Sequence, residues 1–213
     1  MPLGLSILMY YIPSVLSSTF LSCIDTPVLI DFKKHADVGT PSVLFDWTTD
    51  VDTCEWKGIT CTSGVPRRVS RIDISGWPEP LKGSLPASLA RLTHLERLFL
   101  ARNNLTGLLP SFDWAKKLMH LEALDLHGNA FTGPLPPSLG SLINLRYLDL
   151  SSNDLNGSIP DEFGSLTSLV HLRLSHNELS GMIPATFRNL GTNLRGLYLD
   201  HNRYFSLLCS LCW

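Results

Sequence analysis

Several histidines and aspartates fall at matching places in a repeated stretch in the second half of this 213-residue chain. They are Asp125, His127, Asp149, His171 and His176. Imidazole and carboxylate groups transfer protons in many enzymes and are common ligands of transition metals. If the fold gathers these side chains on one surface, they could form an acid–base pair or a metal site.

Other features of the sequence favour binding over catalysis. Cys209 and Cys212 have the spacing of a metal-binding pair, but no second pair lies beside them. The chain has no glycine-rich phosphate loop and no G-x-S-x-G nucleophile motif. The histidines and aspartates also belong to an open face rather than to a pattern that encloses a pocket. We therefore predict no catalytic residue, no metal site and no cofactor.

A repeated phrase must position these side chains. LEALDLHGNAFTGPLPPSLGSL begins at Leu121, LRYLDLSSNDLNGSIPDEFGSL at Leu145 and LVHLRLSHNELSGMIPATFRNL at Leu169, so the period is 24 residues. Leucines in this arrangement, at a period between about 20 and 29 residues, are typical of the leucine-rich repeat. Less regular copies begin at Val69, Leu95 and Leu194, so residues 69–202 contain about six repeats.

The repeat predicts an α/β solenoid, a curved right-handed coil with a parallel β-sheet on its concave face. Each L-x-L core is expected to form a short strand that stacks about 4.8 Å from the next. The leucines should point inward, and the Gly-x-(Leu/Ile)-Pro segment should turn the chain, because prolines such as Pro134 cannot continue a ladder. One asparagine per repeat is expected to satisfy backbone groups at the turn: Asn103, Asn129, Asn153, Asn177 and Asn202.

The variable positions around L-x-L face the concave side and form four columns. The first column precedes the middle leucine, the second follows it, and the third and fourth follow the last leucine. Six strands span about 25 Å, enough for a peptide or one edge of a protein. The alternative is a solvated face without a partner, but aromatic and arginine side chains favour binding. The predicted ligand-binding residues are Asp125, His127, Tyr147, Asp149, His171, Arg173, His176, Tyr198 and His201.

The residues before the repeats predict a leader and a cap. Residues 1–22 are apolar and uncharged, which favours a signal peptide; an uncleaved membrane anchor is the alternative. Residues 23–68 should cap the solenoid, because a first repeat would otherwise expose an apolar face and a strand edge. We expect a helix capped by Thr26, with Pro27 in its first turn. Cys54 and Cys61 are expected to form a disulfide, with two free thiols as the alternative.

The setting of the chain is predicted to be oxidising and extracellular. The sequons at Asn104 and Asn156 are expected to fall in turns of the repeats, where a glycan could project outward. Together with the leader and the cysteine pair they favour secretion to the extracellular space or cell wall, with attachment to the plasma membrane as the alternative. The formal charge of −2, with acidic and basic residues interleaved, argues against a nucleic-acid partner.

The pattern stops after Asn202. The repeat phrase gives way to RYFSLLCSLCW in residues 203–213, and no C-terminal cap is visible. We interpret this tail as aberrant and expect a truncated product of a longer gene, whose uncapped edge could self-associate. The alternative is that FSLLCSLCW is itself a compact cap.

The phrase L-x-G-x-I-P resembles the plant-specific class of leucine-rich repeats. The segments VLIDFKK and LFDW, and Cys54-x-Trp56-x-Gly58-x-x-Cys61, resemble the N-terminal cap of that family, and the resemblance covers residues 23–202. Many family caps carry adjacent cysteines here, one of which bonds a cysteine before the cap helix. Position 53 of this chain is Thr, so Cys23 lacks that partner.

The family includes extracellular domains of receptor-like kinases and receptor-like proteins, and polygalacturonase-inhibiting proteins. The resemblance implies a non-catalytic recognition protein that binds a peptide or protein ligand on its concave face, in receptor-like signalling or defence. Its partners would include a receptor-kinase co-receptor. The alternative is a secreted inhibitor of a cell-wall-degrading polygalacturonase. The departure at position 53 favours the receptor interpretation.

Overall fold

The computed structural model describes residues 23–37, 39, 42–110 and 117–203. The predicted signal peptide, the tail from residue 204, and Cys209 and Cys212 lie outside these ranges, so those predictions and the predicted self-association stay untested. Within the described ranges, no helix combines the length and apolar character needed to cross a membrane.

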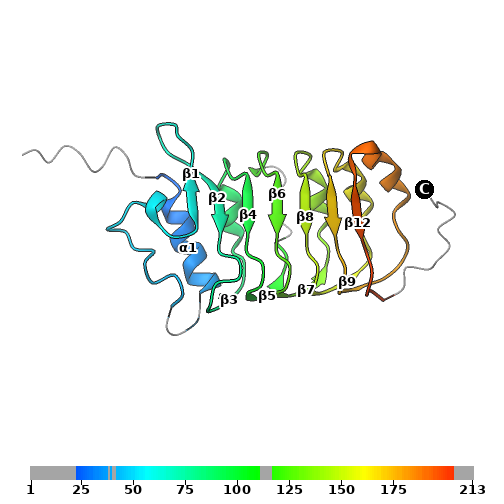
Figure 1. Cartoon of the computed structure of the whole chain (residues 1–213), viewed down its shortest axis with the longest axis horizontal. Coiled ribbons are helices and arrows are strands. Elements are labelled where there is room, and N and C mark those ends of the chain that lie inside the picture. Colours follow the sequence, from blue (N-terminus) through cyan, green and yellow to red (C-terminus); the bar gives the residue numbers. More distant parts are fainter. Residues whose placement is uncertain (1–22, 38, 40–41, 111–116, 204–213) are drawn as a thin grey trace, which may run out of the picture.

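A seven-stranded sheet runs the length of the molecule, with its strands side by side (Figure 1). All its neighbouring strands are parallel except β1 and β2. The first column of variable positions stays in register, with Arg97 beside Ala123, Ala123 beside Tyr147, and Tyr147 beside His171. The predicted parallel stacking is therefore confirmed. The strands in spatial order are β1 (Ile59–Cys61), β2 (Val69–Asp73), β4 (Arg97–Phe99), β6 (Ala123–Asp125), β8 (Tyr147–Asp149), β10 (His171–Arg173) and β12 (Gly196–Tyr198).

A second sheet, which was not predicted, forms after the main strands of the repeats, and four of its five strands directly follow a ladder asparagine. It has five strands and lies along the lower edge of the solenoid in Figure 1. Pro134 is the last residue of β7, in register with Asn156 of β9, so the ladder ends at this proline as expected. Proline lacks only the N–H donor, so it is tolerated at such a position. The strands are β3 (Lys82–Gly83), β5 (Asn104–Leu108), β7 (Ala130–Pro134), β9 (Asp154–Gly157) and β11 (Glu178–Leu179).

Short 3₁₀ helices cover the side opposite the main sheet (Figure 1). A methyl group on Gly140 would lie 2.2 Å from the carbonyl oxygen of Glu162, so this helix approaches the next one closely. Between the sheets and helices, the middle leucines of the strands form the core, and Leu148 and Leu172 have no exposed surface. The 3₁₀ helices of the repeats are η2 (Ala87–Arg91), η3 (Pro137–Ser141), η4 (Asp161–Ser165) and η5 (Ala185–Asn193).

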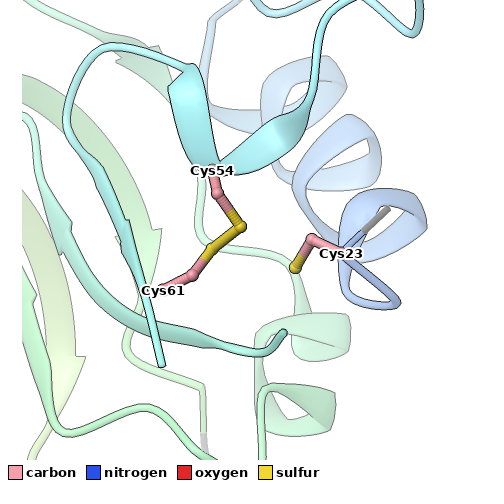
Figure 2. Close-up of side chains that lie close together, drawn as sticks. All are labelled: Cys23, Cys54 and Cys61. Atoms are coloured by element: carbon pink, nitrogen blue, oxygen red, sulfur yellow. A yellow bond between two sulfur atoms is a disulfide. The ribbon is translucent and has the colours of Figure 1, made fainter. Parts of the chain in front are cut away.

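The N-terminal cap consists of α1 (Thr26–Ala36), η1 (Thr53–Glu55) and β1, which pairs antiparallel with the first strand of the repeats. Cys54 and Cys61 form the predicted disulfide, with their Cα atoms 5.6 Å apart (Figure 2). Trp47 stacks on Trp56 with ring centroids 5.2 Å apart. Cys23 is a free, buried thiol beside the disulfide (Figure 2). Its burial raises its pKa, which disfavours the reactive thiolate.

The residue that caps α1 is Asp25, so the prediction of Thr26 as the cap was one residue late. The Asp25 side chain does not bond the helix. It accepts hydrogen bonds from the Arg68 guanidinium at 3.0 to 3.2 Å and from the Val69 amide at 2.8 Å. Because Asp25 is only 2% exposed, this buried ion pair ties the cap helix to the first repeat.

The five asparagines satisfy backbone groups at the turns, as predicted, and they also join each of their repeats to the one before it. The side-chain amide of Asn153 donates to the carbonyl of Leu150 in its own repeat and to that of Leu126 in the preceding repeat, both at 3.1 Å. Its oxygen accepts the amide of Phe131, also in the preceding repeat, at 3.1 Å. The other four ladder asparagines bridge repeats in the same way.

We expect Asn153→Ala to lower the free energy of unfolding by between about 1 and 3 kcal/mol, because it leaves buried backbone groups without partners. Urea denaturation followed by circular dichroism measures the change. Asn144→Ala is the control, since Asn144 is exposed and donates a single bond, to the carbonyl of Met119. Equal effects of the two substitutions would contradict the role of the ladder.

We expect Arg68→Ala to cost about 3 kcal/mol of stability, because it leaves the Asp25 carboxylate buried without its cation. The same denaturation experiment measures it. Arg203→Ala is the matched control: Arg203 pairs with Glu178, and the two side chains are 64% and 41% exposed. An exposed pair is worth less than about 1 kcal/mol. A loss of less than about 1 kcal/mol of stability for Arg68→Ala would show that the cap does not depend on the Asp25–Arg68 ion pair.

Candidate ligand-binding face

The structure brings most of the predicted site residues together on the concave sheet. Tyr147 and His171 are neighbours in the first column, on β8 and β10. Asp125, Asp149, Arg173 and Tyr198 are successive members of the second column, on β6 to β12. His127 lies just beyond β6, whereas His176 and His201 lie in the turns after β10 and β12.

Arg173 is the centre of a cluster on the C-terminal half of this face. Its guanidinium lies over the ring of Tyr198 at 5.0 Å and over that of Tyr147 at 5.8 Å. Its Nη1 lies 3.7 Å from Oδ2 of Asp149. We call Tyr147, Asp149, Arg173 and Tyr198 the Arg173 cluster. Ring faces hold the guanidinium in place without using its N–H donors.

Asp149 organises this cluster from below, since it is only 2% exposed. It accepts hydrogen bonds from the Tyr147 hydroxyl at 2.9 Å, the Ser151 hydroxyl at 2.6 Å and the Ser151 amide at 3.0 Å. Burial, and then the negative charge of Asp149, raise the pKa of Tyr147. Tyr147 is therefore a neutral hydrogen-bond donor with a fixed ring, which suits positioning rather than proton transfer.

His171 packs its ring edge-on against Tyr147, with centroids 6.3 Å apart. The neighbouring Gly196 makes this possible, because a Cβ there would lie 2.7 Å from both His171 Nδ1 and a ring carbon of Tyr198. The buried Nδ1 of His171 has no hydrogen-bond partner among the described residues. His171 thus belongs to the aromatic surface rather than to an acid–base pair.

A hollow of about 530 Å³ lies beside the cluster, over β4 to β8. Ala123 forms part of its lining, between the larger Arg97 and Tyr147 of the first column. Arg97, Phe99 and Ala123 occupy variable positions around L-x-L in the sequence but are not among the predicted ligand-binding residues. A small residue between two large ones in a column was the signal that could have revealed the hollow.

The five side chains that suggested chemistry do not form one site. Asp125, His127 and Asp149 lie within 4.8 Å of one another, but Asp125 Oδ1 is held by the His127 amide at 3.1 Å and by His127 Nδ1 at 2.7 Å. His171 packs on Tyr147, and His176 stacks on His201. This arrangement presents a rigid, mixed surface that can hold a ligand by rings and hydrogen bonds.

The two sequon asparagines lie on the second sheet, Asn104 in β5 and Asn156 in β9, rather than in turns as expected. Both are exposed. Because neither belongs to the concave sheet, glycans there would leave the Arg173 cluster uncovered.

Comparison with known proteins agrees with this geometry. The pattern described as leucine rich repeat matches residues 93–155, 120–179 and 143–204, which together exceed half of the chain. The leucine rich repeat N-terminal domain matches residues 25–62. The chain belongs to the leucine-rich-repeat family.

This leucine-rich-repeat chain is similar to Receptor-like protein 3 of Arabidopsis thaliana, with 39% identity over 66 residues, 31% of this chain and 8% of that protein. It is also 37% identical over 87 residues to Polygalacturonase inhibitor 1 of Phaseolus vulgaris, covering 39% of this chain and 25% of the inhibitor. The matches to these two curated relatives therefore span a quarter or less of their length.

Among solved structures, one similar chain belongs to the Arabidopsis receptor kinase HAESA in complex with the peptide hormone IDA and the co-receptor SERK1. The TM-score is 0.74 and the identity 35%, over 84% of this chain and 29% of that chain. The solenoid of this leucine-rich-repeat protein thus has the fold of known plant receptor domains.

We expect Tyr147→Phe to lower the free energy of unfolding by about 1.5 kcal/mol at neutral pH, because Asp149 loses a charge-assisted hydrogen bond. The pKa of Tyr147 is raised in the folded state, so its contribution is present below about pH 10, the pKa of free tyrosine, and falls above it. Urea denaturation at several pH values measures both effects.

Tyr198→Phe is the control, because Tyr198 contributes its ring face to Arg173 and is 44% exposed. We expect it to change stability by less than about 0.5 kcal/mol. If Tyr147→Phe were equally mild, the Tyr147–Asp149 bond would not organise the face.

Proposed function

We propose that this protein is a non-catalytic extracellular recognition module that binds a peptide or protein ligand on its concave face. The Arg173 cluster and the adjacent hollow form the centre of the binding surface. His127 lies at the edge of this binding surface, and His176 and His201 lie at its edge farther from the centre. In this function the protein acts in receptor-like signalling or defence.

The observation that carries the proposal is the fixed position of the Arg173 guanidinium. Its Nη1 lies 3.7 Å from Asp149 Oδ2, its buried Nε has no hydrogen-bond partner among the described residues, and its side chain is 43% exposed. Two aromatic rings and the buried Asp149 hold the guanidinium in position. An arginine fixed in this way offers preformed donors to a carbonyl or carboxylate of a ligand at little entropic cost.

The hollow supports the same conclusion. Arg97 is exposed at its rim, whereas Arg71 is bound to Asp73 at 2.6 Å and lies over Phe99 at 5.0 Å. The face therefore combines exposed arginines with fixed aromatic rings, the side chains enriched in binding hot spots. A partly apolar depression between them can accept a side chain of an extended peptide.

The relatives and the cap support an extracellular receptor role. The HAESA structure contains a peptide hormone and a co-receptor, which makes a peptide ligand and a receptor-kinase co-receptor reasonable partners. The Cys54–Cys61 disulfide favours an oxidising compartment outside the cell, or a position at the plasma membrane facing outward.

The alternative is inhibition of a cell-wall-degrading polygalacturonase, which the likeness to the Phaseolus inhibitor favours. An inhibitor would reduce the rate of pectin hydrolysis when mixed with the enzyme at micromolar concentration. A receptor-type module would leave that rate unchanged. An assay of reducing ends released from polygalacturonic acid separates the two functions.

We expect Arg173→Ala to weaken binding of a concave-face ligand by about 30-fold, the loss of a hot-spot side chain worth 2 kcal/mol. Suitable probes are peptides selected from a random display library on the immobilised wild-type protein. Affinities of the synthetic peptides are then measured by calorimetry.

Arg91→Ala is the matched control, because Arg91 ends η2 on the opposite side of the solenoid. It should leave affinity unchanged. Selected peptides that bind Arg173→Ala and wild type equally, or a library that yields no specific peptide, would contradict the proposed site.

A further inference from the structure

A second group of side chains gathers at the C-terminal end of the described solenoid. His176 follows β10 and His201 follows β12, at equivalent places in the fourth column. Their imidazole rings are stacked, with centroids 4.1 Å apart and an interplanar angle of 17°. Asp200 lies beside them, and one potential ligand atom from each of the three residues lies within 4.8 Å of the others.

The two histidines share their backbone conformation with the rest of the fourth column. Every member of the column has a positive φ, between 54° and 66°, and four of the six carry a side chain there: Arg102, Ser152, His176 and His201. The turn of the repeat therefore sets this conformation, and it places His176 and His201 at equivalent points of successive turns. Both histidines are exposed.

Asp200 is oriented by its neighbours. The hydroxyl of Ser175 donates to Oδ1, and His201 Nδ1 lies 2.8 Å from Oδ2. The carboxylate is therefore held next to the two imidazole rings on the exposed surface of the turns.

We propose that His176, His201 and Asp200 bind a divalent transition cation of the zinc class. Two imidazole nitrogens and a carboxylate oxygen suit zinc, and three protein ligands leave a coordination position open. Ligand atoms around a tetrahedral zinc lie about 3.3 Å apart, given bonds of about 2.0 Å. Both rings are exposed, so rotation about their side-chain torsions can close the remaining gap.

Such a cation would join the repeats of β10 and β12 across their turns. It would also sit beside the Arg173 cluster, because Tyr198 lies on β12 just before Asp200. The open position could accept an imidazole or carboxylate from a partner. The site therefore adds a metal-dependent contact to the edge of the concave face.

The other cluster with suitable spacing serves as an internal control. Asp125, His127 and Asp149 also lie within 4.8 Å of one another. They contain only one imidazole, and Asp149 already accepts from Tyr147 and Ser151. His127→Ala should therefore leave zinc binding unchanged.

The experiment is calorimetric titration of the untagged full-length chain with ZnCl₂ in a non-chelating buffer. We expect saturable binding, weakened at least about tenfold in His176→Ala and in His201→Ala, as for other losses at metal sites. Circular dichroism should show unchanged folding, since both side chains are exposed. Titration with Co²⁺ should give visible ligand-field bands that both substitutions remove.

Absence of saturable zinc binding would overturn the proposal. So would binding that survives both histidine substitutions, because the cation would then lie elsewhere, for example at Cys209 and Cys212. Equal loss in His127→Ala would also contradict it, since that variant leaves His176, His201 and Asp200 intact.

Discussion

The structure depends on a single hydrogen-bonding device, the asparagine that follows each of the last five L-x-L strands. Its amide reaches the carbonyls of its own repeat and of the one before, and its oxygen accepts an amide of the preceding repeat. A buried polar group is costly unless all its bonds are made, so the device works only when successive repeats align. Repeat spacing, strand register and the direction of the chain after each strand all follow from this alignment.

Register then creates the binding face. Because equivalent positions stack a strand spacing apart, residues that are 24 positions apart in sequence become neighbours, such as Tyr147 and His171. Arg173 lies between two tyrosines for this reason, and Asp149 is buried beneath them. The same stacking brings His176 onto His201 in the turns. The period of the repeat thus determines which side chains are neighbours on the face and in the turns.

The cap covers the apolar face and the strand edge that the first repeat of a solenoid would otherwise expose. β1 pairs with the free edge of β2, and the Cys54–Cys61 disulfide closes the loop that carries it. The Asp25–Arg68 pair binds the cap helix to the same strand. Cys23 is buried next to this disulfide and ion pair. Many family caps have a cysteine at the position of Thr53, whereas here the hydroxyl groups of Thr53 and Thr26 form a hydrogen bond of 2.6 Å.

The leucine spacing by itself determined the fold class and the columns of the concave face, and the recurring asparagines determined the ladder. The residues before the repeats, with Cys54 and Cys61, indicated the cap and its disulfide. All these features depend on the order of residues along the chain. Only the tertiary structure decided which column members touch. The hollow over Ala123, the burial of Asp149 and the stacking of His176 on His201 depend on side-chain size and direction across neighbouring strands.

The second sheet and the role of Asp25 were likewise decided by tertiary structure. The L-x-L pattern marks only the first strand of each repeat, so it did not predict a further strand after it. Asp25 lies in the cap, and its partner Val69 is 44 positions away, so the repeat period does not reveal this contact.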